Sequence, residues 1–138
     1  YARPQRQARH NLNYWTFGDF IGIGAGAHGK LSHADGRIQR TWKTRLPKDY
    51  LASAQRQQAG ARWLDAQELP FEFLMNALRL SDGVPSSLFS QRTGLPLAHL
   101  DAARQRAEQQ GLLNPDPQRL QASPRGQLFL NDLLQLFL

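Results

Sequence analysis

The chain has 138 residues, 41% of them hydrophobic, and no cysteine. This length can bury an apolar core, and the lack of cysteine excludes a disulfide framework, a thiolate zinc site and a cysteine-held iron–sulfur cluster within these residues. The net charge of +6 lies entirely in residues 1–45, which hold eight Lys and Arg against two Asp, whereas residues 46–138 hold nine bases and nine acids. The whole chain is therefore not expected to be a basic nucleic-acid binder.

The N-terminal sequence carries no secretory leader, and its uncharged stretches are too short to span a membrane as a helix. We therefore expect a cytoplasmic location. Because the chain begins at Tyr1 rather than at a methionine, we interpret it as an internal cut from a longer protein.

Residues 1–45 are rich in glycine and aromatic residues, and we expect a short strand at residues 20–24. The pair Asp35-Gly36 predicts a two-residue hairpin turn, which would place His33 opposite Ile38 and Leu31 opposite Arg40. That register assigns four residues to a packed face and four to a wet face: Leu31, His33, Ile38 and Trp42 on the first, and Lys30, Ser32, Gln39 and Thr41 on the second.

From residue 46 the hydrophobic period becomes helical. We expect a first helix at residues 48–58 and a second that begins between Asp65 and Pro70, where Asp65 and Glu68 form a capping box. The apolar side chains of this second helix are predicted to face the core: Phe71, Phe73, Leu74, Met75 and Leu78.

The remaining elements are a short helix at residues 85–92, a helix from Pro96 to Gln110, and extended pieces at residues 112–113 and around Leu120. A last helix begins at Ser123-Pro124, with its apolar residues at Leu130, Leu133, Leu134 and Phe137. The order of helices followed by a two-stranded wing is a winged-helix pattern.

The glycine run at residues 24–29 matches the pattern GxGxxG. A dinucleotide site needs a helix directly after the glycines, so that phosphates meet free backbone donors. Because a hairpin is expected there instead, we do not favour that site. Two interpretations remain open: the run lets a flat or phosphorylated ligand approach the backbone, or it packs tightly against a neighbouring strand.

The second dense group of functional residue types lies at residues 10–15 and includes His10, Tyr14 and Trp15. Histidine is a common ligand of metals and haem iron, and large aromatic side chains suit a planar ligand. A histidine beside aromatic residues can equally be structural. The chain has no nucleophile elbow, P-loop or paired carboxylates on one helical face, so we expect no catalytic residue within it.

Four separated strings of residues together resemble one family. They are His-Asn-Leu-Asn-Tyr-Trp at 10–15, Phe-Gly-Asp-Phe-Ile-Gly-Ile-Gly-Ala-Gly-Ala-His-Gly at 17–29, Glu-Leu-Pro-Phe-Glu-Phe-Leu-Met-Asn-Ala-Leu-Arg-Leu at 68–80, and Phe-Leu-Asn-Asp-Leu-Leu-Gln-Leu-Phe-Leu at 129–138. In this order they resemble the C-terminal third of HemW-like proteins. These are radical S-adenosylmethionine proteins related to the oxygen-independent coproporphyrinogen III oxidase HemN.

The resemblance implies an α+β fold, in which residues 1–45 are the end of a broken barrel with a hairpin and residues 46–138 form a helical domain of winged-helix type. It implies a haem chaperone that passes haem to apoproteins such as respiratory enzymes, and through them peripheral contact with a membrane. An N-terminal barrel would hold S-adenosylmethionine and a 4Fe-4S cluster. The family motif HNxxYW, which marks haem binding, falls on His10, Asn11, Tyr14 and Trp15, with His10 as the iron ligand.

The same resemblance places Ile23, Gly24 and Ala25 on the side that faces S-adenosylmethionine. Two other functions stay open: a porphyrinogen-oxidising enzyme of the same family, and a winged-helix transcription regulator. The regulator requires a positive recognition helix, whereas residues 97–110 carry two bases and two acids. We therefore expect no specific nucleic-acid binding. Arg3, Arg6 and Arg9 precede the haem motif and could pair with haem propionates or a partner.

Overall fold

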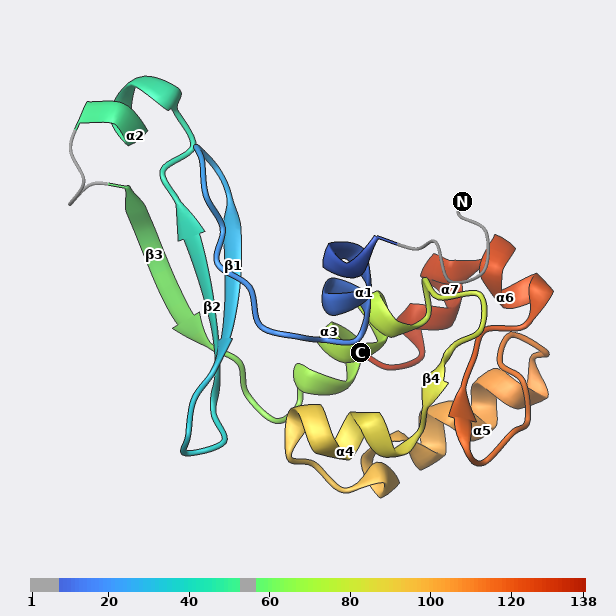
Figure 1. Ribbon diagram of the computed structural model, residues 1–138. Helices are drawn as coiled ribbons and strands as arrows, with labels where there is room; N and C mark the ends of the chain where they lie inside the picture. Colours follow the sequence, from blue (N-terminus) through green and yellow to red (C-terminus); the bar gives the residue numbers. More distant parts are fainter. Residues whose placement is uncertain (1–7, 53–56) are drawn as a thin grey trace. The chain divides into compact units, whose positions relative to one another are not determined.

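The computed structural model describes residues 8–52 and 57–138, and it divides the chain into two compact units (Figure 1). We call residues Gly18–Leu64 the sheet unit, and Asp65–Leu138 together with the described residues up to Phe17 the helical unit. The predicted mixture of helices with a small antiparallel sheet is confirmed. The division expected at residue 45 falls inside the sheet unit, because the strand that begins at Gln58 pairs with the hairpin.

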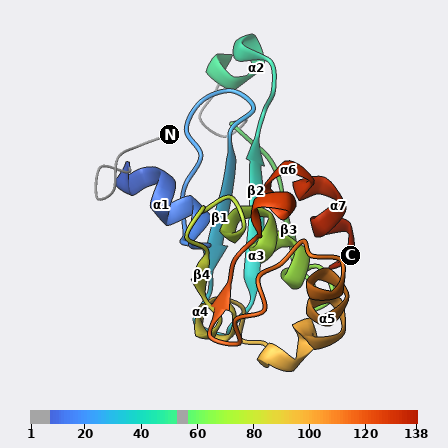
Figure 2. The same ribbon diagram turned by 90° about the vertical axis from the view of Figure 1, so that its right-hand side faces the viewer.

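The sheet unit contains a three-stranded antiparallel sheet with the order β1-β2-β3 and one short helix. Its elements are β1 (His28–Ser32), β2 (Ile38–Lys43), α2 (Pro47–Ala52) and β3 (Gln58–Trp63). Helix α2 lies at one end of the sheet (Figure 2). The predicted helix at 48–58 is wrong at its last residues, because Gln57 lies in a bend and Gln58 begins β3, while residues 53–56 lie outside the described part of the chain. Strand β3 is almost entirely exposed, and it lacks the alternating apolar residues that mark a half-buried strand. This strand could therefore not be predicted from the sequence pattern.

The hairpin register differs from the prediction by one residue. Ser32 pairs with Ile38 and Lys30 with Arg40, while the His33 amide donates to the Arg37 carbonyl at 2.9 Å. The loop thus has three residues instead of two, and it closes through Gly36 at a φ of 82°. Since a one-residue slip moves every side chain of one strand to the other face, the predicted packed and wet faces are wrong. Lys30 lies on the face of Ile38 and is 1% exposed.

The strand expected at residues 20–24 is also wrong. Only Phe20 pairs, through an isolated bridge with Lys30, and the residues after it form no strand. The apolar side chains of Ile21 and Ile23 are 72% and 87% exposed. A strand needs a neighbour for its backbone hydrogen bonds, and here the described chain supplies that neighbour at one residue only.

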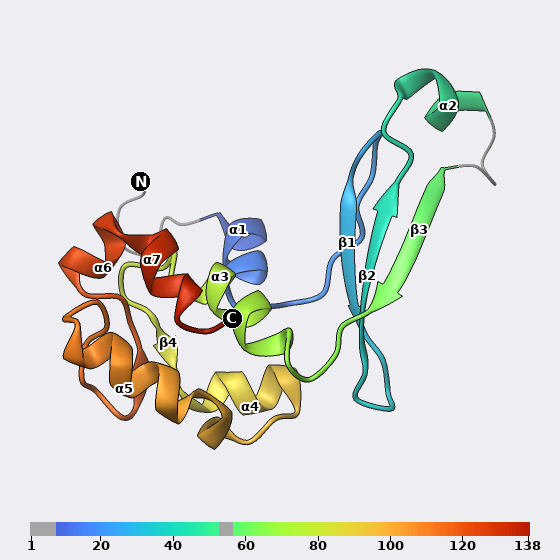
Figure 3. The same ribbon diagram turned by 180° about the vertical axis from the view of Figure 1, so that it is seen from behind.

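The helical unit surrounds a core centred on Phe73, which is 0% exposed and contacts the rings of Phe17 and Phe89 at centroid distances of 5.6 and 5.4 Å. Helix α7 packs against α3 (Figure 3). The elements of this unit are α1 (Arg9–Trp15), α3 (Leu69–Ala77), β4 (Val84–Pro85), α4 (Ser87–Thr93), the 3-10 helix η2 (Leu97–Leu100), α5 (Asp101–Gln109), β5 (Arg119–Leu120), α6 (Pro124–Leu128) and α7 (Leu130–Gln135).

Two predicted helix starts in this unit are confirmed by their caps. The Asp65 amide donates to Glu68 Oε2 at 3.1 Å and the Glu68 amide to Asp65 Oδ1 at 3.0 Å, which is a reciprocal capping box before α3. Ser123 Oγ accepts from the Gly126 amide at 2.9 Å and caps α6. Both caps could be predicted from the sequence, because each side chain accepts from a backbone amide within one turn of its own position.

Several boundaries differ from the predicted ones. Phe73, Leu74 and Leu78 are buried as expected, but Phe71 and Met75 are only half-buried. The helix expected from Pro96 to Gln110 consists of η2 followed by α5, and the last helix is interrupted at Phe129 between α6 and α7.

The helical unit also holds a small antiparallel pair of strands, in which Val84 of β4 pairs with Leu120 of β5. Leu113 forms a bridge with Ala122, which fits the extended pieces expected on either side of the turn at residues 114–117. Across residues 8–52 and 57–138, every helix is too short or too polar to span a membrane.

Candidate functional site

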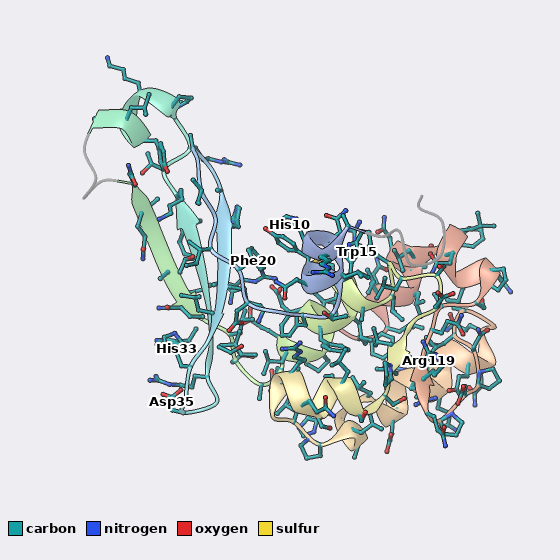
Figure 4. The ribbon with its side chains drawn as sticks, in the orientation of Figure 1. His10, Trp15, Phe20, His33, Asp35 and Arg119 are labelled. Atoms are coloured by element: carbon teal, nitrogen blue, oxygen red, sulfur yellow. The ribbon has the colours of Figure 1, made fainter. Side chains whose placement is uncertain are left out.

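The motif HNxxYW lies on helix α1, where its spacing forms two neighbouring pairs of side chains. Residues four apart share one helical face, so His10 aligns with Tyr14 and Asn11 with Trp15. The rings of His10 and Tyr14 meet edge to face at a centroid distance of 4.8 Å. His10 and Asn11 are exposed, while Tyr14 and Trp15 are half-buried (Figure 4). Helix α1 therefore presents an accessible imidazole beside aromatic rings.

Helix α1 is held in the helical unit by the residue that follows its end. Thr16 Oγ1 donates to the Leu12 carbonyl at 2.7 Å, and Phe17 then takes a left-handed φ of 57°. The Phe17 side chain is 1% exposed and packs against Phe73 of α3. A left-handed conformation costs a non-glycine residue about 1 kcal/mol, which burial of an aromatic ring offsets. Phe17 thus anchors the motif helix without using any of the four motif residues.

Of the three arginines before the motif, Arg9 lies in the described part of the chain. Arg3 and Arg6 lie outside the described residues, so their expected pairing stays a prediction. Arg9 is exposed in the first turn of α1, directly before His10.

The glycine run lies in the sheet unit, and its backbone is tightly packed at one glycine and open at another. A Cβ at Gly22 would lie 2.2 Å from the His28 carbonyl oxygen, so the backbone packs tightly there. At Gly24 no atom lies within 4 Å of the Cβ position, and φ is 105°. Its neighbours Ile23 and Ala25 are exposed. The three residues assigned to the cofactor side therefore offer an open stretch of backbone, although any side chain at Gly24 would also strain it.

A buried ion pair fixes the segment between α1 and the glycine run. Lys30 Nζ donates to Asp19 Oδ1 at 2.8 Å, and Ser32 Oγ donates to the same oxygen at 2.9 Å. Burial raises the pKa of Asp19, but the hydrogen bonds from Lys30 and Ser32 outweigh it and hold that pKa below its ordinary value. This ion pair was not predicted, because the predicted register put Lys30 on the solvent-exposed face of the hairpin.

Two further contacts of the sheet unit were not foreseen. The Gly24 amide donates to the hydroxyl of Tyr50 at 3.1 Å, which ties α2 to the glycine run. At the hairpin, Trp63 lies against His33 at 4.8 Å between centroids, with the Arg37 guanidinium 4.1 Å from its ring centroid. Only a known three-stranded topology could have brought these pairs together, because each joins separate elements.

Two other histidines, His33 and His99, contact neighbouring protein groups. His99 Nδ1 lies 3.3 Å from the Pro96 carbonyl, and His33 packs on Trp63. Within the described part of the chain, no three side chains of the types that bind metals are grouped closely enough to hold an ion. His10 could therefore supply one iron ligand, with any further ligand from elsewhere.

Comparison with known proteins shows which sequences this chain resembles. Residues 64–129 match the family model described as the HemN C-terminal domain. The chain is 46% identical over 138 residues to the protein named "Heme chaperone HemW" of Escherichia coli strain K12, and 41% identical to its namesake in Haemophilus influenzae. Each alignment covers 100% of this chain and 36% of the relative. The chain thus spans about a third of the length of these relatives.

The fold of a solved structure is also similar. Coproporphyrinogen III oxidase (HemN) from Escherichia coli, described as a radical SAM enzyme, matches with a TM-score of 0.58 over 87% of this chain and 28% of its own. At 15% identity this match shows the fold alone. Together the comparisons confirm the resemblance carried by the four strings: the chain is homologous over its whole length to part of the HemW proteins, and residues 64–129 match the HemN C-terminal domain.

Proposed function

We propose that this chain is part of a haem chaperone, in which helix α1 binds haem and the whole protein passes it to apoproteins such as respiratory enzymes. The name of the relatives supports the haem chaperone family. The main support for this site is the exposed His10 imidazole, which contacts the Tyr14 ring edge to face. Helix α1, which holds both residues, is fixed to the helical unit by Phe17 and not by the motif residues. The protein would act in the cytoplasm and reach a membrane only through its recipients.

The chemistry of α1 suits this role. An iron ligand needs a neutral imidazole nitrogen that a bulky porphyrin can reach, and an exposed side chain on a surface helix meets that need. The edge contact with Tyr14 restricts the His10 ring, and the half-buried rings of Tyr14 and Trp15 can cover part of a porphyrin face. Asn11 offers an amide that could bind a propionate.

The proposal extends to the whole protein through residues 1–45, taken as the end of a broken barrel, and residues 46–138, taken as a domain of winged-helix type. In that protein Ile23, Gly24 and Ala25 would line the site of S-adenosylmethionine, and the open backbone at Gly24 fits such an approach. The cofactor and a 4Fe-4S cluster would supply one-electron chemistry. Since this chain has no cysteine, the cluster ligands would come from the N-terminal barrel.

Two alternatives can be weighed against the structure. A porphyrinogen-oxidising enzyme is the second candidate, with which the HemN-like fold is compatible, and assay of the intact protein on coproporphyrinogen separates the two functions. For a DNA-binding regulator the support is weaker. Arg104 pairs with Glu108 at 2.8 Å and donates to the carbonyl of Asp116, while Arg119 donates to the carbonyl of Asp82. These guanidinium groups hold the protein's own backbone.

The decisive experiment is His10→Ala in the full-length protein, with haem titrated under anaerobic conditions. We expect haem affinity to fall by about tenfold or more, the equivalent of one lost ligand bond at ~1.4 kcal/mol or above, and the Soret band to shift. The matched control is His99→Ala, which removes an exposed histidine of the helical unit outside the motif. Unchanged affinity and spectrum in His10→Ala would make His10 merely structural.

A further inference from the structure

The hydroxyl of Tyr50 occupies a position that neither the motif nor the family match assigns. Tyr50 lies on α2, and its oxygen accepts the Gly24 amide at 3.1 Å. The chain before β1 runs alongside that strand and reverses at the end of the sheet that carries α2 (Figure 1). The contact therefore joins α2 to the glycine run at the point where the run turns into β1.

Three backbone donors of this turn are in use. The Gly26 amide donates to the Thr44 carbonyl at 2.8 Å and the Ala27 amide to the Gly24 carbonyl at 3.2 Å. The Gly24 amide donates to Tyr50, so the amides of residues 24, 26 and 27 all have acceptors within the protein. A ligand over Gly24 would therefore have open space beside it, but none of these three amides could donate to the ligand. Apart from the Ala25 amide, a polar ligand would need its hydrogen-bond donor from a side chain.

Tyr50 can supply that donor. A phenol has one proton to donate besides the lone pairs that accept. Among residues 8–52 and 57–138, the Tyr50 hydroxyl accepts from Gly24 and has no protein acceptor for its own proton. A hydroxyl that already accepts a hydrogen bond is polarised into a better donor. The side chain is half-buried, so the proton remains within reach of a ligand.

The surroundings indicate which part of a ligand lies there. Ile23 presents an apolar side chain that is 87% exposed, next to a residue without a side chain. An apolar surface beside bare backbone fits a flat ring, and a purine carries ring nitrogens that accept hydrogen bonds but bear no proton. A donor held next to that surface matches a purine edge.

We propose that Tyr50 is a ligand-binding residue, whose hydroxyl donates a hydrogen bond to a ring nitrogen of the adenine of S-adenosylmethionine lying over Ile23 and Gly24. This assignment rests on the proposed function, because it takes the cofactor to bind at the glycine run. It gives α2 a role in ligand binding, since the hydroxyl that donates to the base lies on that helix.

The test uses the full-length protein with its cluster reconstituted, and measures the dissociation constant of S-adenosylmethionine by equilibrium dialysis. We expect Tyr50→Phe to weaken binding about tenfold, the usual loss for one hydrogen bond to a ligand. Ser81→Ala is the control, since it removes an exposed hydroxyl of the helical unit outside both proposed sites, and it should leave this affinity unchanged. Normal cofactor affinity in Tyr50→Phe overturns the proposal.

Ligand analogues separate a direct contact from a mere clamp on the loop. Methylthioadenosine and its 1-, 3- and 7-deaza analogues are bound to the wild type and to Tyr50→Phe. A direct contact requires the penalty of Tyr50→Phe to vanish for the one analogue that lacks the contacted nitrogen. An equal penalty for all four ligands overturns the proposal in favour of a clamp.

The failure of the underlying site gives a different pattern. Gly24→Val adds a branched side chain to the open backbone, and weak cofactor binding in this variant supports the site at the glycine run. If Gly24→Val and Tyr50→Phe both bind normally, the proposed site fails together with the role of Tyr50. If only Tyr50→Phe binds normally, the site stands and the role of Tyr50 is wrong.

Discussion

The helical unit and the sheet unit are stabilised by different interactions. Nearly all of the buried apolar side chains found in the described residues belong to the helical unit, and only Ile38 and Leu64 lie in the sheet unit. The sheet unit instead buries Lys30, which pairs with the exposed Asp19, and leaves Ile21 and Ile23 exposed. The comparison indicates that apolar burial stabilises the helical unit, whereas the sheet unit depends more on specific polar contacts.

The largest expected effect is on the core of the helical unit. Phe73→Ala removes a ring that contacts both Phe17 and Phe89, and we expect it to lower the free energy of unfolding by about 3–5 kcal/mol. Urea unfolding followed by circular dichroism measures this loss. Phe129→Ala is the control, because that side chain is 51% exposed and should change stability by less than about 1 kcal/mol. Equal losses in both variants would contradict the assignment of the core.

A smaller effect is expected from the ion pair of the sheet unit. Asp19→Asn removes the carboxylate that pairs with the buried Lys30 ammonium, and we expect a loss of about 1–2 kcal/mol, below the value for a fully buried pair because the Asp19 side chain is 44% exposed. Asp35→Asn breaks an exposed pair with Arg37 and is the matched control. Adding Lys30→Met to Asp19→Asn should recover much of the loss. No recovery would mean that Lys30 stabilises the unit by other contacts.

The same pair predicts the direction of a pH dependence. The pKa of Asp19 is lower in the folded protein than in the unfolded chain, so the unfolded state binds more protons as the solution becomes acidic. The contribution of Asp19 is therefore full above its ordinary pKa of about 3.9 and is lost as pH falls through the folded-state pKa. The stability difference between wild type and Asp19→Asn should shrink over that acidic range. A difference that grows on acidification would contradict the lowered pKa.

The contrast between the units also explains what could be predicted from the sequence. In the helical unit, the capping box of Asp65 and Glu68, the cap at Ser123 and the buried Leu133 and Leu134 follow from local chemistry and from a hydrophobic period of 3.6 residues. The unforeseen break at Phe129 interrupts that period only locally.

In the sheet unit, the sequence indicated the hairpin but not its register. Asp35-Gly36 is compatible with loops of two or three residues, and the choice between them moves Lys30 from one face to the other. Strand β3 could not be predicted from alternation, because both of its faces are largely exposed. The residue types at positions 10–15 indicated a candidate site, but its assignment to haem came from the resemblance, and the helix that displays it was not expected. Its haem-binding role stays a prediction.

The smallest expected effect is on DNA binding, where residues 65–138 differ from residues 1–45. Besides the engaged Arg104 and Arg119, Arg106 donates to the Leu136 carbonyl at 3.1 Å, so the helical unit can neutralise few phosphates. The excess positive charge lies in residues 1–45 and can give weak, salt-sensitive binding without sequence preference. Titration with genomic and random duplexes at near-physiological salt should therefore show no saturable binding tighter than about 1 μM. Arg106→Gln should leave any weak binding unchanged, since a guanidinium bound to its own backbone contributes little to a duplex contact. Tight binding to one duplex that Arg106→Gln abolishes would instead establish a recognition helix at α5 and favour the regulator.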